Sequence, residues 1–171
     1  MKESILQFIQ GLGISPEFAV LMLATLPIFE LRGSMPVGIL VLDLPVMRTA
    51  FYSVVGNMIP VVPILLLFEP AYSALARVPA LDRFFQWLIN RTRRKGKIIE
   101  SLKLVGLAVF VGVPLPGTGA WAGCVAAFLF RIPFRQALLA IFAGVMMACV
   151  IVALVIQGVL YLPDIFGLPH R

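Results

Sequence analysis

The sequence predicts an all-α integral membrane protein built from two inverted repeats. Each repeat is a broken, re-entrant helical hairpin followed by a transmembrane helix, and interfacial amphipathic helices lie beside them. Composition is the first indication, because 61% of the 171 residues are hydrophobic and 13% are charged, against about 45–50% and about 25% in soluble domains. The mean hydropathy of +1.03 agrees. The order of the apolar stretches, which alternate between broken and continuous, is the second indication.

The first half of the chain predicts three elements in order. Residues 1–14 place apolar side chains at helical spacing with Lys2 as the cation, which is typical of a short interfacial helix rather than a signal peptide. Phe18 to Leu42 is long enough to cross a bilayer but is interrupted by "ELRGSMP". Thr49 to Phe68 is uncharged and about one membrane thickness long.

The second half repeats this order after a basic connector. Leu104 to Phe130 is apolar but broken by "PLPGTG", and Ala137 to Leu160 is continuous. We therefore expect one membrane domain over residues 1–171, divided into an interfacial helix 1–14, a first repeat 15–70, a connector 71–100, a second repeat 101–163 and a tail 164–171.

An offset of 88 residues relates the two halves. It places Pro45 on Pro133 and Gly56 on Gly144, and it brings "ELRG" over "TGAW" so that the two breaks coincide. Interrupted segments at matching positions in two halves are typical of transporters with internal repeats.

The breaks leave two topologies open. Each arm of about 10–12 residues is about 15–18 Å of helix, half of the hydrocarbon core, so a break either kinks a spanning helix or turns a re-entrant hairpin. The connector Arg77 to Lys103 holds eight of the 14 basic residues and is expected in the cytoplasm. Only re-entrant breaks also place Arg131 and Arg135 there, so they are favoured, and the halves are then inverted.

The connector also predicts a partner. Leu81, Phe84, Phe85 and Leu88 fall on one helical face beside the basic run "RTRRKGK", which is typical of an amphipathic segment on anionic lipid. Membrane lipid is therefore the expected partner. Nucleic acid is not expected, because topology already accounts for the positive charge.

The first motif that could carry chemistry holds Glu30 and Arg32. Ionisable groups at membrane depth are costly and are functional by default. The two residues face one site only if the backbone unwinds there, which Gly33 and Pro36 would permit. Arginine suits bidentate capture of phosphate or carboxylate, and a desolvated glutamate can take up a proton. A local ion pair that only stabilises the hairpin tip is the alternative.

The second motif, "VPLPGTGAW", has no charge. Pro114 and Pro116 would end one half-helix, while Gly117 and Gly119 would let a ligand approach the backbone. The N–H groups of the next half-helix and the Thr118 hydroxyl could then bind an anion or polar group. A hairpin turn with close helix packing through "GAWAG" is the alternative.

Other residue types narrow the function classes. Asn57, inside the second apolar stretch, is either a site residue or an interhelical hydrogen-bonding group. Cys124 and Cys149 lie in apolar stretches and read as small core residues, and His170 is the single histidine. We expect no cofactor, no metal site and no enzyme, since histidine-based mechanisms and paired carboxylates have no residues to use.

The motifs "FELRGSMPVGI", "PLPGTGAWAG" and "RIPFRQALLAIFAGV" together resemble the putative small multidrug export protein family of bacteria and archaea over nearly the whole chain. That family is similar to the DedA/VTT membrane proteins, whose relatives include lipid transporters with two re-entrant hairpins. The resemblance implies a multi-pass protein of the prokaryotic cytoplasmic membrane, with Glu30 and Arg32 as the charged first hairpin. DedA proteins usually carry an arginine in the second hairpin, where this chain has "PLPGTG".

Three hypotheses follow. The first is a small proton-coupled secondary transporter of a small or amphipathic anionic substrate, in which Arg32 binds the anion and Glu30 couples proton uptake to release. The second is a DedA-like translocase or scramblase for phospholipid or polyprenyl phosphate. The third is a non-transporting membrane scaffold that recruits partners through the connector. A homodimer is expected in the first two cases, because four elements make a thin wall around a pathway.

Overall fold

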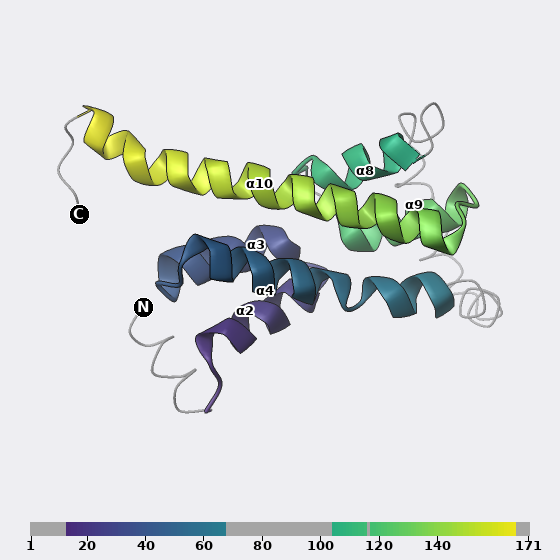
Figure 1. The fold of residues 1–171 in the computed structure, drawn as a ribbon, viewed down its shortest axis with the longest axis horizontal. Coiled ribbons are helices and arrows are strands. Elements are labelled where there is room, and N and C mark those ends of the chain that lie inside the picture. The colour runs from purple at the N-terminus through teal and green to yellow at the C-terminus, as the bar shows by residue number, and fades with distance from the viewer. Residues whose placement is uncertain (1–12, 68–103, 116, 167–171) are drawn as a thin grey trace. The chain divides into compact units, whose positions relative to one another are not determined.

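A computed structural model describes residues 13–67, 104–115 and 117–166, and all regular structure in these ranges is helical. Its helices are α2, α3, η1, α4, α8, α9 and α10 (Figure 1). The predicted interfacial helix, the connector, Pro116 and most of the tail lie outside the described residues. The all-helical fold class is therefore confirmed for the part of the chain that the structure describes.

The first hairpin begins with α2, Pro16–Thr25. Ser15 caps this helix because its Oγ accepts a hydrogen bond from the Phe18 N–H at 3.2 Å, and Pro16 occupies a first-turn position where no N–H is needed. The helix ends before Pro27, since proline disfavours helical geometry in the residue before it. Leu26 is accordingly extended, with ψ of 136°.

The second arm of this hairpin corrects the predicted position of the break. "ELRGSMP" is itself a helix, α3 (Glu30–Pro36), and the interruption lies at residues 26–29. Pro36 does not end the helix, which continues as a π-helix, η1 (Val37–Val41). Proline removes one backbone donor from the regular ladder, and a wider turn is one way to continue past it. Pro27, not Pro36, therefore breaks the segment.

Two long helices follow the predicted continuous stretches. α4 (Val46–Met58) continues through a turn at residues 59–60 into helix 61–67, and Val46–Leu67 is one apolar segment of 22 residues. α10 (Phe134–Phe166) contains an apolar segment of 26 residues, Phe134–Val159. Both are long and apolar enough to cross a membrane. Large apolar side chains such as Phe51 and Leu139 are exposed along them, as expected for lipid-facing positions.

The second hairpin consists of α8 (Leu104–Gly112) and α9 (Ala120–Leu129). As predicted, α8 ends shortly before Pro114, and the described connecting residues 113–115 and 117–119 are not helical. Both arms are half as long as a membrane helix.

The element boundaries repeat with an offset of 88 residues. α2 begins at Pro16 and α8 at Leu104, while α4 begins at Val46 and α10 at Phe134. The second arms end at Val41 and Leu129. Even the backbone conformation after these arms corresponds, because Asp43 and Arg131 have φ of 53° and 50°. Each lies two residues before a proline, Pro45 or Pro133.

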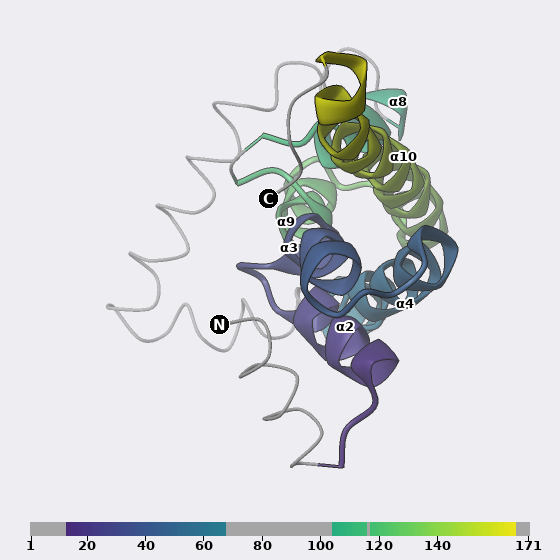
Figure 2. The ribbon, with the colours of Figure 1, turned by 90° about the vertical axis from the view of Figure 1, so that its left-hand side faces the viewer.

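The described helices form two compact units, and both long helices contribute to each. The first unit holds α2, α3, η1, α4 as far as Gly56 and α10 from Ala148 onward. The second runs from Asn57 to Met147 and holds α8 and α9. Figure 2 shows α2, α3 and α4 of the first unit in the view turned by 90°.

The cores confirm the interpretation of both cysteines as small buried residues. Cys149 and Cys124 are free and buried. In the first unit, the Cys149 Sγ lies 3.8 Å from the Met35 Sδ. In the second, the Cys124 Sγ lies 4.0 Å from the Val61 carbonyl oxygen.

Candidate functional site

Glu30 is a buried acid at the start of α3, with 7% of its surface exposed. Its φ of 47° is left-handed, which is uncommon for a residue with a side chain. Its N–H donates to the Leu26 carbonyl at 2.9 Å, which closes the turn across the break. The carboxylate therefore stands at the junction of the two arms, where the chain reverses.

Arg32 lies two residues after Glu30. It is half-buried and interacts electrostatically with the Glu30 carboxylate. Residues two apart on a regular helix point to different faces, but Glu30 departs from helical geometry and is thereby freed from that constraint. The structure thus brings the acid and the base into electrostatic range.

Gly33 and Pro36 do not unwind the backbone, contrary to the sequence-based expectation, since α3 runs through both residues. A Cβ on Gly33 would lie 2.9 Å from the Phe29 ring, so the glycine makes room for that side chain. Pro36 instead marks the start of the π-helical turn. The conformational departure that the pair needs is supplied by Glu30 itself.

The second motif forms the turn between α8 and α9. Gly117 and Gly119 have φ of 75° and 143°, conformations that side chains rarely permit. Pro114 follows α8 directly, as the sequence predicted, and Pro116 lies outside the described residues. The two glycines are therefore required by the turn, whether or not a ligand approaches them.

Thr118 stabilises this turn from within. Its Oγ1 lies 2.8 Å from the carbonyl oxygens of Val113 and of Leu115, to which it donates, and the residue is 7% exposed. A hydroxyl has a single hydrogen to share between them. Its donor capacity is thus directed at the end of α8, and its lone pairs are what it could offer to a ligand.

The structure adds a set of buried polar residues that the sequence reasoning missed. The Ser34 Oγ donates to the Ser53 Oγ at 2.8 Å, joining α3 to α4, and both residues are 0% exposed. Thr49 is equally buried one turn earlier, and its Oγ1 donates to the Pro45 carbonyl at 3.1 Å. The spacing of Thr49, Ser53 and Asn57 at every fourth residue was the available signal.

Asn57 is buried on the same helix, with 3% of its surface exposed. Its Oδ1 has no hydrogen-bond partner among the residues that the structure describes. The interhelical hydrogen bond that the sequence left open is therefore not made by this oxygen within the described ranges. A buried polar atom without a partner is uncommon and calls for an explanation.

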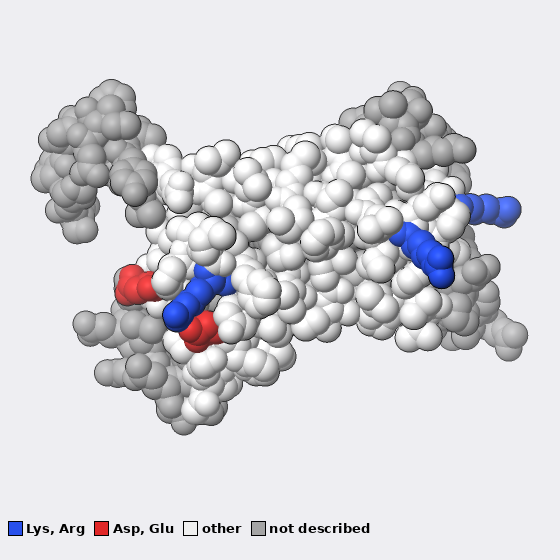
Figure 3. All heavy atoms as spheres, viewed as in Figure 1, with Lys and Arg blue, Asp and Glu red and all other residues white. Residues whose placement is uncertain are grey.

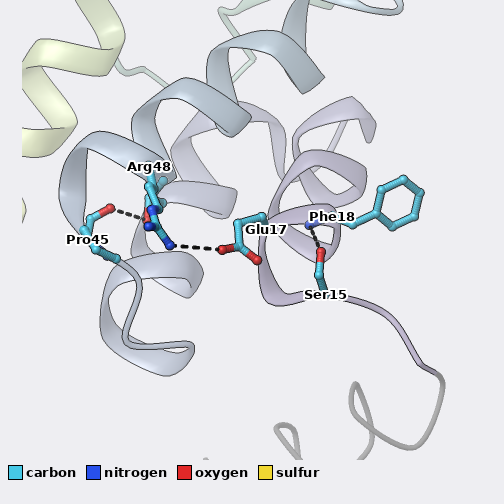
Figure 4. Close-up of polar contacts among 6 residues, drawn as sticks. Ser15, Glu17, Phe18, Pro45 and Arg48 are labelled. Atoms are coloured by element: carbon cyan, nitrogen blue, oxygen red, sulfur yellow. Dashed lines mark hydrogen bonds and ion pairs between the residues drawn. The ribbon is translucent and has the colours of Figure 1, made fainter.

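The two hairpin ends of the first unit meet at an ion pair. The Arg48 Nη1 lies 3.6 Å from the Glu17 Oε1, which joins the start of α4 to the start of α2 (Figure 4). Charged side chains are few on the face drawn in Figure 3, and a basic and an acidic one touch at its lower left. Arg48 is largely exposed, with 67% of its side chain accessible, against 23% for Glu17, and such a surface pair adds about 0–1 kcal/mol. Its importance is geometric, because the chain enters and leaves this hairpin at the same end.

The second unit has an open groove of about 750 Å³ beside the turn between α9 and α10. Apolar side chains dominate its lining, and the cation in it is Arg131. The lining residues are Leu65, Cys124, Ala127, Phe128, Leu129, Arg131, Ile132, Pro133 and Phe134.

The predicted site residues thus fall into sets that belong to different units. Glu30, Arg32, Gly33 and Pro36 lie together in the first unit. Asn57, Pro114, Gly117, Thr118 and Gly119 belong to the second.

Comparison with known proteins gives one match. The model of a family described as "Putative small multi-drug export protein" matches residues 30–151, which is more than half of the chain. The match begins at Glu30, directly after the first hairpin turn at residues 26–29, and it includes the second hairpin turn. No curated protein and no solved structure matches the chain.

Proposed function

Because the chain belongs to the putative small multi-drug export protein family, we propose that it is a small proton-coupled secondary transporter of the prokaryotic cytoplasmic membrane. Its cargo is a small or amphipathic anion. Two apolar helices of membrane-spanning length and the family membership support a membrane protein concerned with export.

One observation carries this proposal: a buried carboxylate and a half-buried guanidinium interact where a half-length hairpin reverses. An ionisable group at membrane depth costs at least about 2.5–3.5 kcal/mol on insertion scales. A turn alone does not need that cost, because the second hairpin reverses with uncharged residues, Gly117 to Gly119.

The chemistry follows from competition for Arg32. An anionic cargo and the Glu30 carboxylate both favour contact with the guanidinium. Protonation of Glu30 removes the competing charge and strengthens cargo binding, whereas loss of the proton restores the ion pair and releases the cargo. Release thus follows loss of the proton, an order that differs from the sequence-based expectation. Cargo and proton then move in the same direction, so an inward proton gradient drives the cargo inward, and export requires a cargo gradient that exceeds the opposing proton gradient.

The architecture that we propose keeps the two re-entrant hairpins and the inverted repeats. The common offset of 88 residues supports the repeats. The Glu17–Arg48 pair supports a re-entrant first hairpin, since a kinked spanning helix would carry its two ends to opposite membrane surfaces. Two arginines, Arg131 and Arg135, lie at the start of α10, against Arg48 alone at the start of α4. This excess agrees with the positive-inside bias if the two helix starts face opposite sides.

In this architecture each hairpin turn offers groups that a cargo can contact near mid-depth. Glu30, Arg32, Gly33 and Pro36 supply the first turn, while Pro114, Pro116 and Gly117 to Gly119 supply the second. Asn57 adds a polar group on a spanning helix. The connector lies in the cytoplasm against anionic lipid, and a second copy of the chain completes the wall.

The decisive experiment is Glu30→Gln in proteoliposomes with an inward proton gradient and an amphipathic anionic dye as cargo. Glutamine keeps the size of the side chain but cannot release a proton, so we expect proton-driven dye accumulation to be lost. Glu17→Gln is the matched control, because Glu17 is the acid of the surface pair. Accumulation that persists in Glu30→Gln, with its pH dependence unchanged, would contradict the mechanism.

The groove of the second unit favours a second candidate function, lipid translocation. A groove of mixed polar and apolar surface, lined mostly by apolar side chains with one guanidinium, suits an acyl chain attached to a phosphate. A fluorescent phospholipid should then cross vesicle membranes without a proton gradient. Arg131→Gln should slow this crossing, while Arg48→Gln should not. If lipid movement requires the proton gradient, the groove would instead be part of the proton-coupled transporter.

A further inference from the structure

The polar face of α4 is unusual for the interior of a membrane protein. Thr49, Ser53 and Asn57 follow one another at every fourth residue, so they share one face of the helix. Their exposed fractions are 0%, 0% and 3%. Ser and Thr are among the small residues that membrane helix contacts favour, whereas a buried Asn is expected to hydrogen-bond across to another helix.

Within the first unit, this face meets the second arm of the hairpin. Ser53 accepts the hydrogen bond from Ser34 of α3, and a Cβ on Gly38 of η1 would collide with the Thr49 methyl group. These four residues form a contact that we call the α3–α4 seam. Asn57 follows one helical turn after Ser53 on α4.

The internal repeat provides a control for this seam. At the offset of 88, Thr49, Ser53 and Asn57 correspond to Ala137, Ile141 and Val145 of α10. These three residues are just as buried, with exposed fractions of 0%, 0% and 1%. In the second unit, Ile141 packs near Gly123 of α9. Equivalent helix positions are therefore polar in the first repeat and apolar in the second. The helical packing itself does not require the polar residues.

Hydrogen bonding between helices explains only one of the three polar residues of α4. Ser34 and Ser53 do join two helices. Thr49 does not, because its hydroxyl donates to Pro45 one turn earlier in its own helix. The Asn57 Oδ1 has no partner among the described residues, although it lies midway along the 22-residue apolar segment. Midway along a spanning helix is where transporters bind their ligands.

We propose that the α3–α4 seam, continued by Asn57, is the polar lining of the transport pathway, and that this lining is confined to the first repeat. It takes water and the hydrogen-bonding groups of the cargo, and the Asn57 Oδ1 accepts from one of them. This inference rests on the proposed transport function.

The energetics explain why this seam opens and its counterpart stays closed. When hydroxyl groups separate, water replaces their hydrogen bonds, so most of the lost bonding is recovered. When apolar groups separate, their surface is exposed to water with no such replacement. The α3–α4 contact is thus the hydrated one during transport, and the contact of α9 with α10 remains packed.

Cysteine accessibility tests the lining directly. In a background with Cys124→Ala and Cys149→Ala, we would compare Ser53→Cys and Asn57→Cys with their counterparts Ile141→Cys and Val145→Cys. The probe is a water-soluble, positively charged thiosulfonate, applied to vesicles that hold the transporter under a proton gradient. Cysteines at 53 and 57 should react about tenfold faster than those at 141 and 145, since reaction requires water at the thiol.

Two results would overturn the proposal: equal rates at both pairs, or faster reaction at 141 and 145. If Ser53→Cys does not fold, as judged by gel filtration, Thr49→Cys and Ala137→Cys replace that pair. The labelling does not depend on Glu30 chemistry. If positions 53 and 57 are not labelled faster and Glu30→Gln loses transport, only the proposal that the seam lines the pathway is wrong. If they are labelled faster and Glu30→Gln still transports, only the proposed proton coupling is wrong.

A functional variant adds a second reading. Asn57→Val installs the residue that the second repeat uses, so the fold should tolerate it while dye accumulation falls. Asn57→Asp retains a carbonyl acceptor and should retain more transport than Asn57→Val. A fully active Asn57→Val variant would show that the Oδ1 has no ligand.

Discussion

At the scale of single residues, two glycines show how closely the helices of each unit approach. A Cβ on Gly56 of α4 would collide with the Leu21 carbonyl and would lie 2.9 Å from the Ala24 Cβ, both on α2. On Gly144 of α10 it would lie 2.6 Å from the Ala108 carbonyl and from the Val111 Cβ, both on α8. In each unit the glycine meets a carbonyl and a side chain three residues apart. The two glycines correspond at the offset of 88 residues in the sequence. In the structure both are needed because a neighbouring helix leaves no room for a Cβ.

Gly144→Ala should therefore destabilise the protein by about 1–3 kcal/mol, the usual cost of an added methyl group in a filled interior. The atoms that the new methyl group meets are backbone and a branched side chain, which have little room to move. The shift is measured as a loss of thermal stability in detergent.

Gly158→Ala is the matched control on the same helix, because a Cβ there would meet nothing within 4 Å. Alanine in an open helical position should be neutral or stabilise by about 0.5–1 kcal/mol. Equal effects of the two substitutions would mean that α8 does not approach α10 closely at Gly144.

At the scale of elements, the sequence predicted the number and length of the apolar segments well. Period, length and the absence of charge identified both long helices, and proline with glycine identified both interruptions. It misplaced the first break, because Pro27 and Pro36 are equivalent by residue type alone. Which one ends a helix depends on whether a π-helical turn follows, and that is decided by packing.

The candidate site was predictable to a similar degree. An acid and an arginine in an apolar run are visible in the sequence, and they do interact. Ser34, Thr49 and Ser53 were missed because hydroxyl residues are common in membrane helices, and their meaning depends on which face is buried. The sequence left Thr118 open between a ligand and a hairpin turn, and its hydroxyl donates hydrogen bonds within the turn that holds it.

The first hairpin makes a prediction at this scale, because its two ends meet at the Glu17–Arg48 pair. Cysteines at Ser15 and Met47, placed in the background without native cysteines, should react with a membrane-impermeant reagent from the same side of sealed vesicles. Both positions are exposed. Reaction from opposite sides would mean that the segment crosses the membrane.

At the scale of the whole molecule, the offset of 88 residues relates two units of similar construction and different content. The first unit holds the buried Glu30 with Arg32 and the polar seam, while the second holds Asn57, an uncharged hairpin turn and apolar helix contacts. The repeated design therefore carries different side chains in its two units.

Inverted repeats place equivalent positions on opposite membrane surfaces, and this gives the prediction for the molecule as a whole. A cysteine at Phe134 should react with an impermeant reagent only from the cytoplasmic side. A cysteine at Met47, near the corresponding end of α4, should react only from the outside. If both cysteines react from the same side of the membrane, the repeats are parallel and the re-entrant model is wrong.

The division of both long helices between the units has a consequence for synthesis. The first unit includes residues 148–166, and Cys149 contacts Met35, so residues 114 positions apart in the chain must meet. The ribosome has released nearly the whole chain before the first unit can close. Until then, the unit that holds Glu30 and the hydroxyl groups of α4 lacks its last helical segment. A chain truncated before Ala148 should therefore be a substrate for membrane proteases.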